Sequence, residues 1–242
     1  MSPPAPLVPA PAPAVVAARI DDVWRRVEGT GRDRDTVRLV AVTKGFDAAA
    51  VTAALAAGVG DIGENYATEL VAKAALVAAA SAGAGPRPVW HYLGAVQRRR
   101  VRDLAPVVGC WQTVARAVEG EAIARRAPGA AVLVEMDTSG QPGRNGCPPA
   151  AVPGLVGALR ALDLDVRGLM VVAPAGGGRP ARAAFRTAAR LAADLGLDEL
   201  SMGMTDDLEV ALEEGATMVR MGRALFGPRP GSPPAGAPPP RR

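Results

Sequence analysis

Short apolar segments alternate with longer alanine-rich segments along most of the chain. The apolar segments have the length and composition of buried strands. They predict eight strands, at residues 38–43, 61–63, 89–94, 107–113, 131–136, 166–172, 199–202 and 218–221. The intervening segments have helical spacing and predict seven helices, at residues 48–57, 68–80, 97–104, 115–126, 150–162, 180–195 and 206–214. An amphipathic helix at about residues 14–28 precedes the first strand.

Strands that alternate with helices in this way are typical of an α/β protein, and eight such units predict a single (β/α)8 barrel of the TIM type. An open, doubly wound sheet is the alternative. Its dinucleotide signature, Gly-x-Gly-x-x-Gly after the first strand, is absent, because that strand runs into Thr43, Lys44 and Gly45. The barrel is therefore predicted at residues 14–228. Residues 1–13 and 229–242, rich in proline and alanine, are predicted to be disordered tails.

The composition of the 242-residue chain fits one domain with a sizeable core, since 49% of its residues are hydrophobic. No apolar run approaches the roughly 20 residues of a membrane helix. The proline-broken start lacks the pattern of a signal peptide. We therefore expect no membrane partner and a cytoplasmic location.

Cysteine and histidine are too scarce for a disulfide framework or a histidine-based zinc site. Cys110 lies in an apolar strand and is predicted to pack in the core. Cys147 lies beside two loop prolines and is predicted to be an exposed thiol. The single histidine, His91, is predicted to be a hydrogen-bonded barrel residue.

The net charge of +4 raises the question of nucleic-acid binding. Arg98, Arg99, Arg100 and Arg102 form one cluster that could neutralise several phosphates. Aromatic residues that could stack on bases are scarce nearby, and a solvated helix face is the commoner arrangement. The sequence therefore predicts no nucleic-acid partner.

A lysine stands where a barrel places its functional residues, at the carboxyl end of a strand. Lys44 follows the first strand, and a lysine desolvated there has a lowered pKa and can form an imine with an aldehyde. The alternative is a rim lysine in a salt bridge with Glu64. The only other lysine, Lys73, is expected on a helix remote from the barrel mouth.

The ends of the seventh and eighth strands supply a candidate phosphate site. Ser201 offers a hydroxyl donor, and Gly222 allows a close approach of the backbone. Arg220 points the same way as Gly222, because it alternates with Val219 and Met221. An imine-forming lysine, a phosphate site and an inward arginine together describe a pyridoxal 5'-phosphate (PLP) site.

Several segments match one known family in order and with similar spacing. They are Val40-Ala41-Val42-Thr43-Lys44, Gly63-Glu64-Asn65-Tyr66, Trp90-His91-Tyr92-Leu93-Gly94 with Gln97, Thr138-Ser139-Gly140, Arg167-Gly168-Leu169-Met170, Leu200 to Asp207, Glu214 to Thr217, Val219 to Gly222, and Leu225-Phe226-Gly227. From about residue 20 to 228, the chain resembles the YggS/PROSC family of PLP homeostasis proteins.

The resemblance implies a barrel like the N-terminal domain of alanine racemase. It implies that Lys44 holds PLP as an internal aldimine, with Asn65 beside the cofactor and Arg220 facing the pyridine nitrogen. Ser201 and the backbone of Gly222 and Arg223 would bind the phosphate. The implied function is to buffer PLP in the cell or deliver it to PLP-dependent apo-enzymes, without established turnover, as a monomer.

The chain departs from the family pattern at three places. Arg223 replaces the usual Ser or Thr, which removes a hydroxyl contact to the phosphate. The usual Gln-x-Asn-Lys is here Gln97 followed by three arginines, and a family lysine is here Arg144.

A PLP-dependent racemase is the alternative function. PLP acts as an electron sink when its pyridine nitrogen is protonated, and an arginine, which only donates, would keep that nitrogen unprotonated. The resemblance to alanine racemase also implies that a racemase needs two proton-transferring groups, one of which is a tyrosine from a second domain. Tyr66 and Tyr92 are the only tyrosines of this chain. The sequence therefore predicts a binding protein with negligible turnover.

Overall fold

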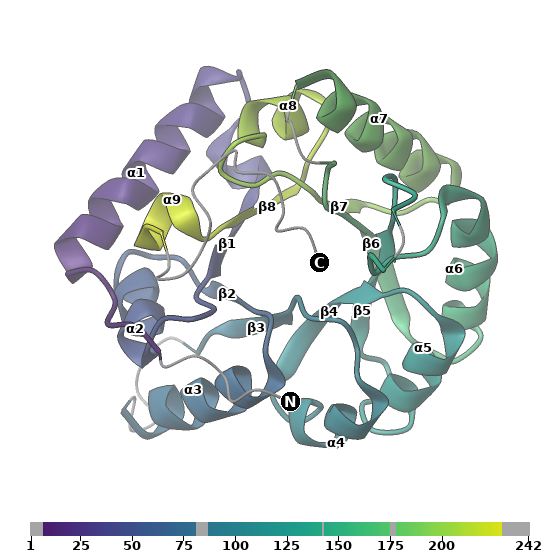
Figure 1. Cartoon of the computed structure of the whole chain (residues 1–242), viewed down its shortest axis with the longest axis horizontal. Coiled ribbons are helices and arrows are strands. Elements are labelled where there is room, and N and C mark those ends of the chain that lie inside the picture. Colours follow the sequence, from purple (N-terminus) through teal and green to yellow (C-terminus); the bar gives the residue numbers. More distant parts are fainter. Residues whose placement is uncertain (1–6, 81–86, 142, 175–177, 229–242) are drawn as a thin grey trace.

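Eight parallel strands close into a barrel in sequence order, with helices around the outside (Figure 1). The computed structural model describes residues 7–80, 87–141, 143–174 and 178–228. The strands are β1 Arg38–Val42, β2 Asp61–Glu64, β3 Val89–Tyr92, β4 Val108–Val114, β5 Ala131–Met136, β6 Asp165–Val171, β7 Glu199–Ser201 and β8 Met218–Met221. The predicted barrel is confirmed, and the open sheet is excluded because β1 pairs with both β2 and β8.

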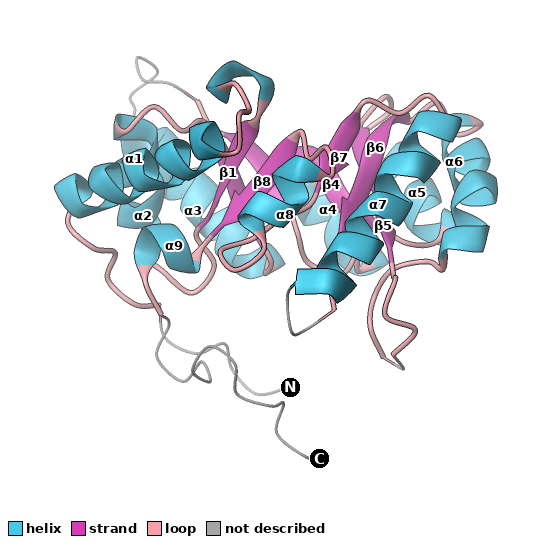
Figure 2. Cartoon of the chain, turned by 90° about the horizontal axis from the view of Figure 1, so that it is seen from above, coloured by secondary structure: helices cyan, strands magenta, loops and turns pink. Residues whose placement is uncertain are grey.

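The helices described in the structure cover the barrel wall (Figures 1 and 2). They are α1 Pro13–Gly29, α2 Ala48–Ala56, α3 Ala67–Ala80, α4 Val101–Leu104, α5 Ala117–Ala124, α6 Val152–Arg160, α7 Gly178–Asp194, α8 Leu208–Glu213 and α9 Arg223–Phe226. Short 3-10 turns precede β1, α4 and α6, at Arg34–Thr36, Arg98–Arg100 and Pro149–Ala151. None of the described helices is both long and apolar enough to cross a membrane.

Five of the seven predicted helices are shorter than expected, and one helix was not predicted. The segment 97–104 forms a 3-10 turn and the four-residue helix α4. Pro106 stands two residues after α4, and the residue before a proline disfavours helical geometry. Helix α6 likewise follows a 3-10 turn that contains Pro149. Helix α9 spans four residues, too few to give a periodic signal.

The strands separate two apolar regions. Their outward side chains and the helices form the main core, which includes Leu39 and Ala41 of β1. A small second cluster of Cys110, Leu133 and Met170 lies on the other face of β4, β5 and β6. Successive side chains of a strand point to opposite faces, so this second cluster fills part of the barrel interior. The prediction that Cys110 packs in the core is confirmed.

One sequence-based expectation about exposure is wrong. Cys147 is 6% exposed, because its N–H donates to Glu135 O at 2.9 Å and its carbonyl accepts from Asp137 N at 2.9 Å. Burial raises the pKa of this thiol to about 11. Within the predicted N-terminal tail, Val8 pairs with the loop after β1: its N–H donates to Gly45 O and its carbonyl accepts from Asp47 N, both at 2.9 Å. Residues 1–6 and 229–242 of the predicted tails lie outside the described part of the chain.

Candidate functional site at the carboxyl end of the barrel

Lys44 lies in the turn that follows β1 and is half-buried. Thr43 extends the pairing of β1 with β2, since its N–H donates to Gly63 O at 3.0 Å. A Cβ added to Gly63 would contact Val40 and Val42, which places these two side chains on the face opposite to Leu39 and Ala41. Thr43 continues this alternation with its side chain toward α3, where it bonds Glu64, and Lys44 follows in the turn at the carboxyl end of β1.

A buried ionic cluster lies directly behind Lys44. Lys73 of α3 is 1% exposed, and its Nζ lies 2.5 Å from Glu64 Oε1 and 3.2 Å from Glu69 Oε2. The same ammonium donates to the carbonyl of Thr43 at 2.9 Å. Burial raises the pKa of the Glu64 carboxyl, and the charge of Lys73 opposes that effect.

This cluster corrects one expectation. Lys73 was expected far from the mouth, yet its long stem carries the amine to the residue that precedes Lys44. Glu64 forms its described ion pair with Lys73 through Oε1, and its buried Oε2 has no hydrogen-bond partner among the described residues. The spacing of Glu69 and Lys73, four residues apart on one helix, was the available signal.

The cluster fixes the backbone on both sides of Lys44. Thr43 donates its hydroxyl to Glu64 Oε1 at 2.6 Å, and Gly45 donates its N–H to Glu69 Oε2 at 2.8 Å. Gly45 has a φ of +80°, a backbone conformation that glycine adopts without steric cost. The turn that carries Lys44 is therefore held by charge-assisted hydrogen bonds, which are among the stronger ones in proteins.

Arg220 of β8 points into the barrel, as predicted from its strand alternation, and is 5% exposed. Its Nη1 donates to the carbonyl and hydroxyl oxygens of Ser201 at 2.7 and 2.8 Å, and its Nη2 donates to Val171 O at 2.9 Å. Burial lowers the pKa of Arg220 to about 10, so the guanidinium keeps its charge at neutral pH. These three bonds to described residues leave two of its five N–H donors.

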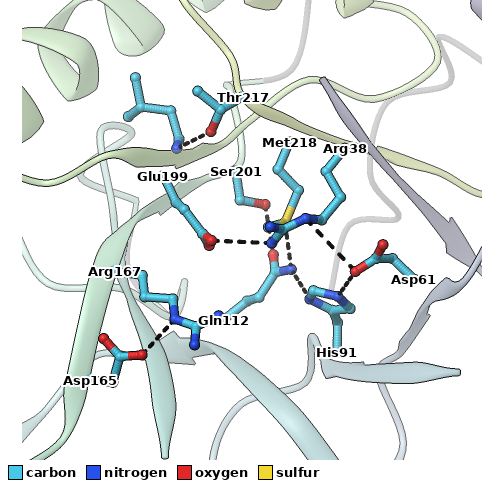
Figure 3. A network of polar contacts seen from close by, with 11 residues as sticks. Arg38, Asp61, His91, Gln112, Asp165, Arg167, Glu199, Ser201, Thr217 and Met218 are labelled. Carbon is cyan, nitrogen blue, oxygen red and sulfur yellow. Dashed lines mark hydrogen bonds and ion pairs between the residues drawn. The ribbon is translucent and has the colours of Figure 1, made fainter. Parts of the chain in front are cut away.

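A chain of hydrogen bonds runs from Arg220 through the barrel interior, and Figure 3 shows most of its members. Ser201 donates to Gln112 Oε1 at 2.6 Å, and Gln112 Nε2 donates to His91 Nδ1 at 2.7 Å. The donating amide assigns the His91 proton to Nε2, which lies 2.7 Å from Asp61 Oδ1. Every donor therefore points toward Asp61, at the opposite end of the barrel. The prediction that His91 is a hydrogen-bonded barrel residue is confirmed.

The hydrogen-bond chain in the barrel interior includes the Ser201 hydroxyl, which was predicted to bind phosphate. Ser201 is fully buried and uses its one proton on Gln112 while it accepts from Arg220. In this arrangement Ser201 holds Arg220 in place. Gln112 carried no signal in the sequence, because all strands of a parallel barrel are buried on both faces and their inward residues do not stand out.

The loops after β7 and β8 are tied to each other. Gly203 accepts from Arg220 N at 3.0 Å, and Thr205 Oγ1 accepts from Ala224 N at 3.3 Å. Met204 N donates to Asp207 Oδ1 at 2.6 Å. A Cβ added at Gly222 would lie 3.3 Å from Val42 O, so the backbone of β8 passes close to the end of β1 at this point.

Arg223 and Asn65 complete the set of predicted residues. The Arg223 guanidinium forms an ion pair with Asp206 at the surface, and both side chains are exposed. Asn65 donates from Nδ2 to Leu93 O at 3.2 Å, while its buried Oδ1 has no partner among the described residues. The six predicted residues thus lie at the carboxyl ends of β1, β2, β7 and β8, which are neighbours in the barrel.

Comparison with known proteins shows which family of barrels this chain is similar to. The family model of the alanine racemase N-terminal domain matches residues 17–230. A pyridoxal phosphate homeostasis protein from Pseudomonas aeruginosa is 40% identical over 224 residues, which cover 89% of this chain and 94% of that protein. A protein of the same name from Deinococcus radiodurans is 38% identical, over 81% of this chain and 91% of the relative.

The chain therefore belongs to the family of pyridoxal phosphate homeostasis proteins. Among solved structures, PipY from Synechococcus elongatus with PLP bound superposes with a TM-score of 0.74 at 31% identity. The match covers 88% of this chain and 100% of PipY.

Proposed function

We propose that this chain binds PLP through Lys44 at the carboxyl end of the barrel and serves PLP homeostasis in the cytoplasm, as a monomer that buffers the cofactor or delivers it to apo-enzymes. One observation carries the proposal: the turn of Lys44 is fixed on both sides by a buried ionic cluster, next to the strand that presents Arg220. The names of the relatives at 38–40% identity and the PLP-bound PipY structure support the choice of cofactor.

The residues at the mouth fit PLP by their chemistry. The buried Asn65 Oδ1 lacks a partner among the described residues, and Arg220 has two further N–H donors. PLP offers an aldehyde for the Lys44 amine, a pyridine nitrogen that accepts a hydrogen bond, and a phosphate. We assign the nitrogen to Arg220 and the phosphate to the backbone of Gly222 and Arg223, because glycine permits a close approach.

Contacts from the side chains of Arg223 and Ser201 to the phosphate would require each side chain to leave its present partner. The Arg223 guanidinium could replace the hydroxyl usual at its position, but it would have to leave its ion pair with Asp206. An exposed pair of this kind contributes about 0–1 kcal/mol, so the exchange is inexpensive. Ser201 would have to give up its bond to Gln112 to donate to a phosphate, and we therefore assign it to the site through Arg220.

We further propose that the protein has negligible turnover. PLP supplies an electron sink when bound, and that sink is strong only when the ring nitrogen is protonated. Arg220 can only donate, so it would hold that nitrogen unprotonated. Tyr92 is buried against Trp111, at a ring distance of 5.7 Å, and its hydroxyl donates to Ala95 O at 3.4 Å, which supports a structural role for this tyrosine. Tyr66, 50% exposed, makes no described hydrogen bond that would aim its hydroxyl at the barrel mouth.

A spectroscopic experiment tests the cofactor proposal. The purified protein, supplemented with PLP, should absorb near ~420 nm, and borohydride followed by peptide mapping should find the cofactor on Lys44. Lys44→Ala should lose this signal and keep its fold by circular dichroism. Modification of Lys73 instead, or a featureless spectrum of the wild-type protein, would contradict the assignment.

Turnover and delivery are tested separately. Racemisation or transamination of L- or D-alanine should not exceed the rate of free PLP, while an added apo-enzyme should gain activity from the loaded protein. Turnover that disappears in Lys44→Ala would favour the racemase alternative.

A further inference from the structure

Five arginines converge on one cavity on the outer surface of the barrel. The cavity has a volume of about 390 Å³ and is lined by Arg98, Arg99, Arg102, Arg125, Arg126 and Ala122. Arg98 and Arg99 come from the 3-10 turn before α4, and Arg102 from α4 itself. Arg125 and Arg126 follow the end of α5. Helices α4 and α5 are neighbours in the outer ring (Figure 1), and the arginines on or beside them line the same cavity.

The ion pairs described for this surface leave positive charge in excess. Arg102 lies 3.3 Å from Asp103, and Arg125 lies 3.9 Å from Glu121. The side chains of Arg98 and Arg126 make no ion pair within the described ranges, 7–80, 87–141, 143–174 and 178–228. Like charges that share a small volume repel one another, and a bound anion relieves that repulsion.

The chemistry of the lining selects the kind of anion. Guanidinium groups bind phosphate through paired, parallel N–H donors, which favours them over lysine for this purpose. The lining contains no aromatic ring on which a nucleic-acid base could stack. Its volume lies at the small end of the range of ligand sites, about 300–1,000 Å³. These features fit a compact anion with several charges and do not fit a strand of nucleic acid.

We propose that this arginine pocket, lined by Arg98, Arg99, Arg102, Arg125 and Arg126, binds a small soluble anion that carries two or more phosphate groups. The pocket is a separate site from the one at the barrel mouth, since it lies outside the barrel wall on α4 and α5, and it does not depend on PLP binding. Asp103 and Glu121 limit the positive charge at its edge and so favour a compact ligand over an extended polyanion.

Isothermal titration of the full chain with inorganic triphosphate tests the proposal, with orthophosphate as the single-phosphate comparison. Triphosphate should bind at least tenfold more tightly than orthophosphate, and its affinity should fall as salt is raised. Arg98→Gln and Arg126→Gln should each weaken binding by about tenfold or more, the loss expected for a charge-assisted bond. Arg190→Gln is the matched control, because Arg190 is an exposed arginine on α7, across the barrel from α4 (Figure 1).

Further variants distinguish the effect of the positive charge of Arg126 from that of its paired N–H donors, and the arginine pocket from the site at the barrel mouth. Arg126→Lys keeps the charge but not the paired donors, and should recover part of the affinity that Arg126→Gln loses. Gly222→Val, which disturbs the phosphate site proposed at the barrel mouth, should bind triphosphate like the wild type. Neither glutamine substitution should lower the melting temperature of the free protein, since each removes repulsion.

Three results would overturn the proposal. Equal affinity for triphosphate and orthophosphate would mean that the arginines do not act together. Loss of binding in Gly222→Val, with no loss in the arginine variants, would place triphosphate at the barrel mouth. Tighter binding of a single-stranded oligonucleotide than of triphosphate would identify the surface as a nucleic-acid site instead.

Discussion

At the amino end of the barrel, Arg38 lies 3.1 Å from Glu199 and 3.9 Å from Asp61, and Arg167 lies 2.6 Å from Asp165. Figure 3 shows these charged side chains directed at one another. At the carboxyl end, by contrast, Arg220 makes its described bonds to neutral oxygens and Asn65 keeps a buried acceptor without a described partner. The charged groups at the amino end pair mostly with one another, although the buried Glu199 Oε2 also lacks a described hydrogen-bond partner. At the carboxyl end, Arg220 makes no ion pair with a described carboxylate, which leaves its charge available to a ligand.

The contrast explains why a large cavity alone does not locate the site. A cavity of about 500 Å³ opens at the amino end, lined among others by Trp24, Arg34, Arg38 and Asp61. Arg34 stacks over Trp24 at 4.7 Å from the ring centre, and Arg38 is paired with two carboxylates. The two arginines that line this cavity are thus already engaged by neighbouring side chains. In barrels of this kind the amino end contributes stability and the carboxyl end carries function.

The largest difference between the two ends should appear in phosphate recognition at Gly222. A valine there would push against Val42 O, which a Cβ already approaches to 3.3 Å, and would move the backbone of β8. Charge-assisted bonds contribute roughly 1.5–3 kcal/mol each, so losing several should weaken PLP binding about a thousandfold. The dissociation constant is measured by absorbance titration of Gly222→Val. Pyridoxal, which lacks the phosphate, should bind the wild type as poorly.

Gly60 provides the control for that substitution at the amino end. It precedes β2 and has no atom within 4 Å of an added Cβ. Gly60→Val should leave PLP affinity unchanged. Equal affinity of the wild type for PLP and pyridoxal would refute the phosphate site, whatever the glycine variants do.

The next largest effect should come from the ionic cluster behind Lys44. Lys73→Ala would leave the buried carboxylates of Glu64 and Glu69 without their cation. Removing one partner of a buried pair costs about 3–5 kcal/mol, which urea unfolding would measure as a drop in the free energy of unfolding. Lys73→Met combined with Glu64→Gln removes one charge of each sign and should recover part of this loss. A loss below about 1 kcal/mol in Lys73→Ala would show that the cluster does not anchor the turn.

The interior hydrogen-bond chain joins the two ends, and its middle member should have an intermediate effect. Gln112→Leu removes the acceptor of Ser201 and the donor to His91. Unsatisfied buried polar groups cost roughly 1–3 kcal/mol each, so we expect about 2 kcal/mol of destabilisation in urea unfolding. The matched control is Gln97→Leu, because Gln97 is exposed before α4. If both substitutions cost the same, the chain contributes nothing to stability.

The strands could be predicted from the sequence, whereas the side-chain contacts that link them could not. The bounds of β5 and β8 were predicted to the residue, because parallel strands form short apolar runs between helices. Lys44 and Asn65 follow β1 and β2, and Arg220 lies in β8, as the strand pattern indicated, while their roles toward PLP stay predictions. Lys73 was misplaced because helix spacing gives the face of a residue but not the reach of a four-carbon stem. Gln112 was missed because its hydrogen bonds to His91 and Ser201 join separate strands.

The smallest effect is expected at the amino end, where Arg38 and its two carboxylates are partly exposed. The Arg38 side chain is 41% exposed, and those of Glu199 and Asp61 are 17% and 25% exposed. Water screens such pairs, so Arg38→Ala should lower the free energy of unfolding by about 1 kcal/mol or less. PLP affinity should not change, because Arg38 reaches the mouth only through Asp61 and the interior chain. A loss near that of Lys73→Ala would mean that the ion pairs at the amino end stabilise the barrel as strongly as the buried cluster at the mouth, and the distinction between the two ends would then fail.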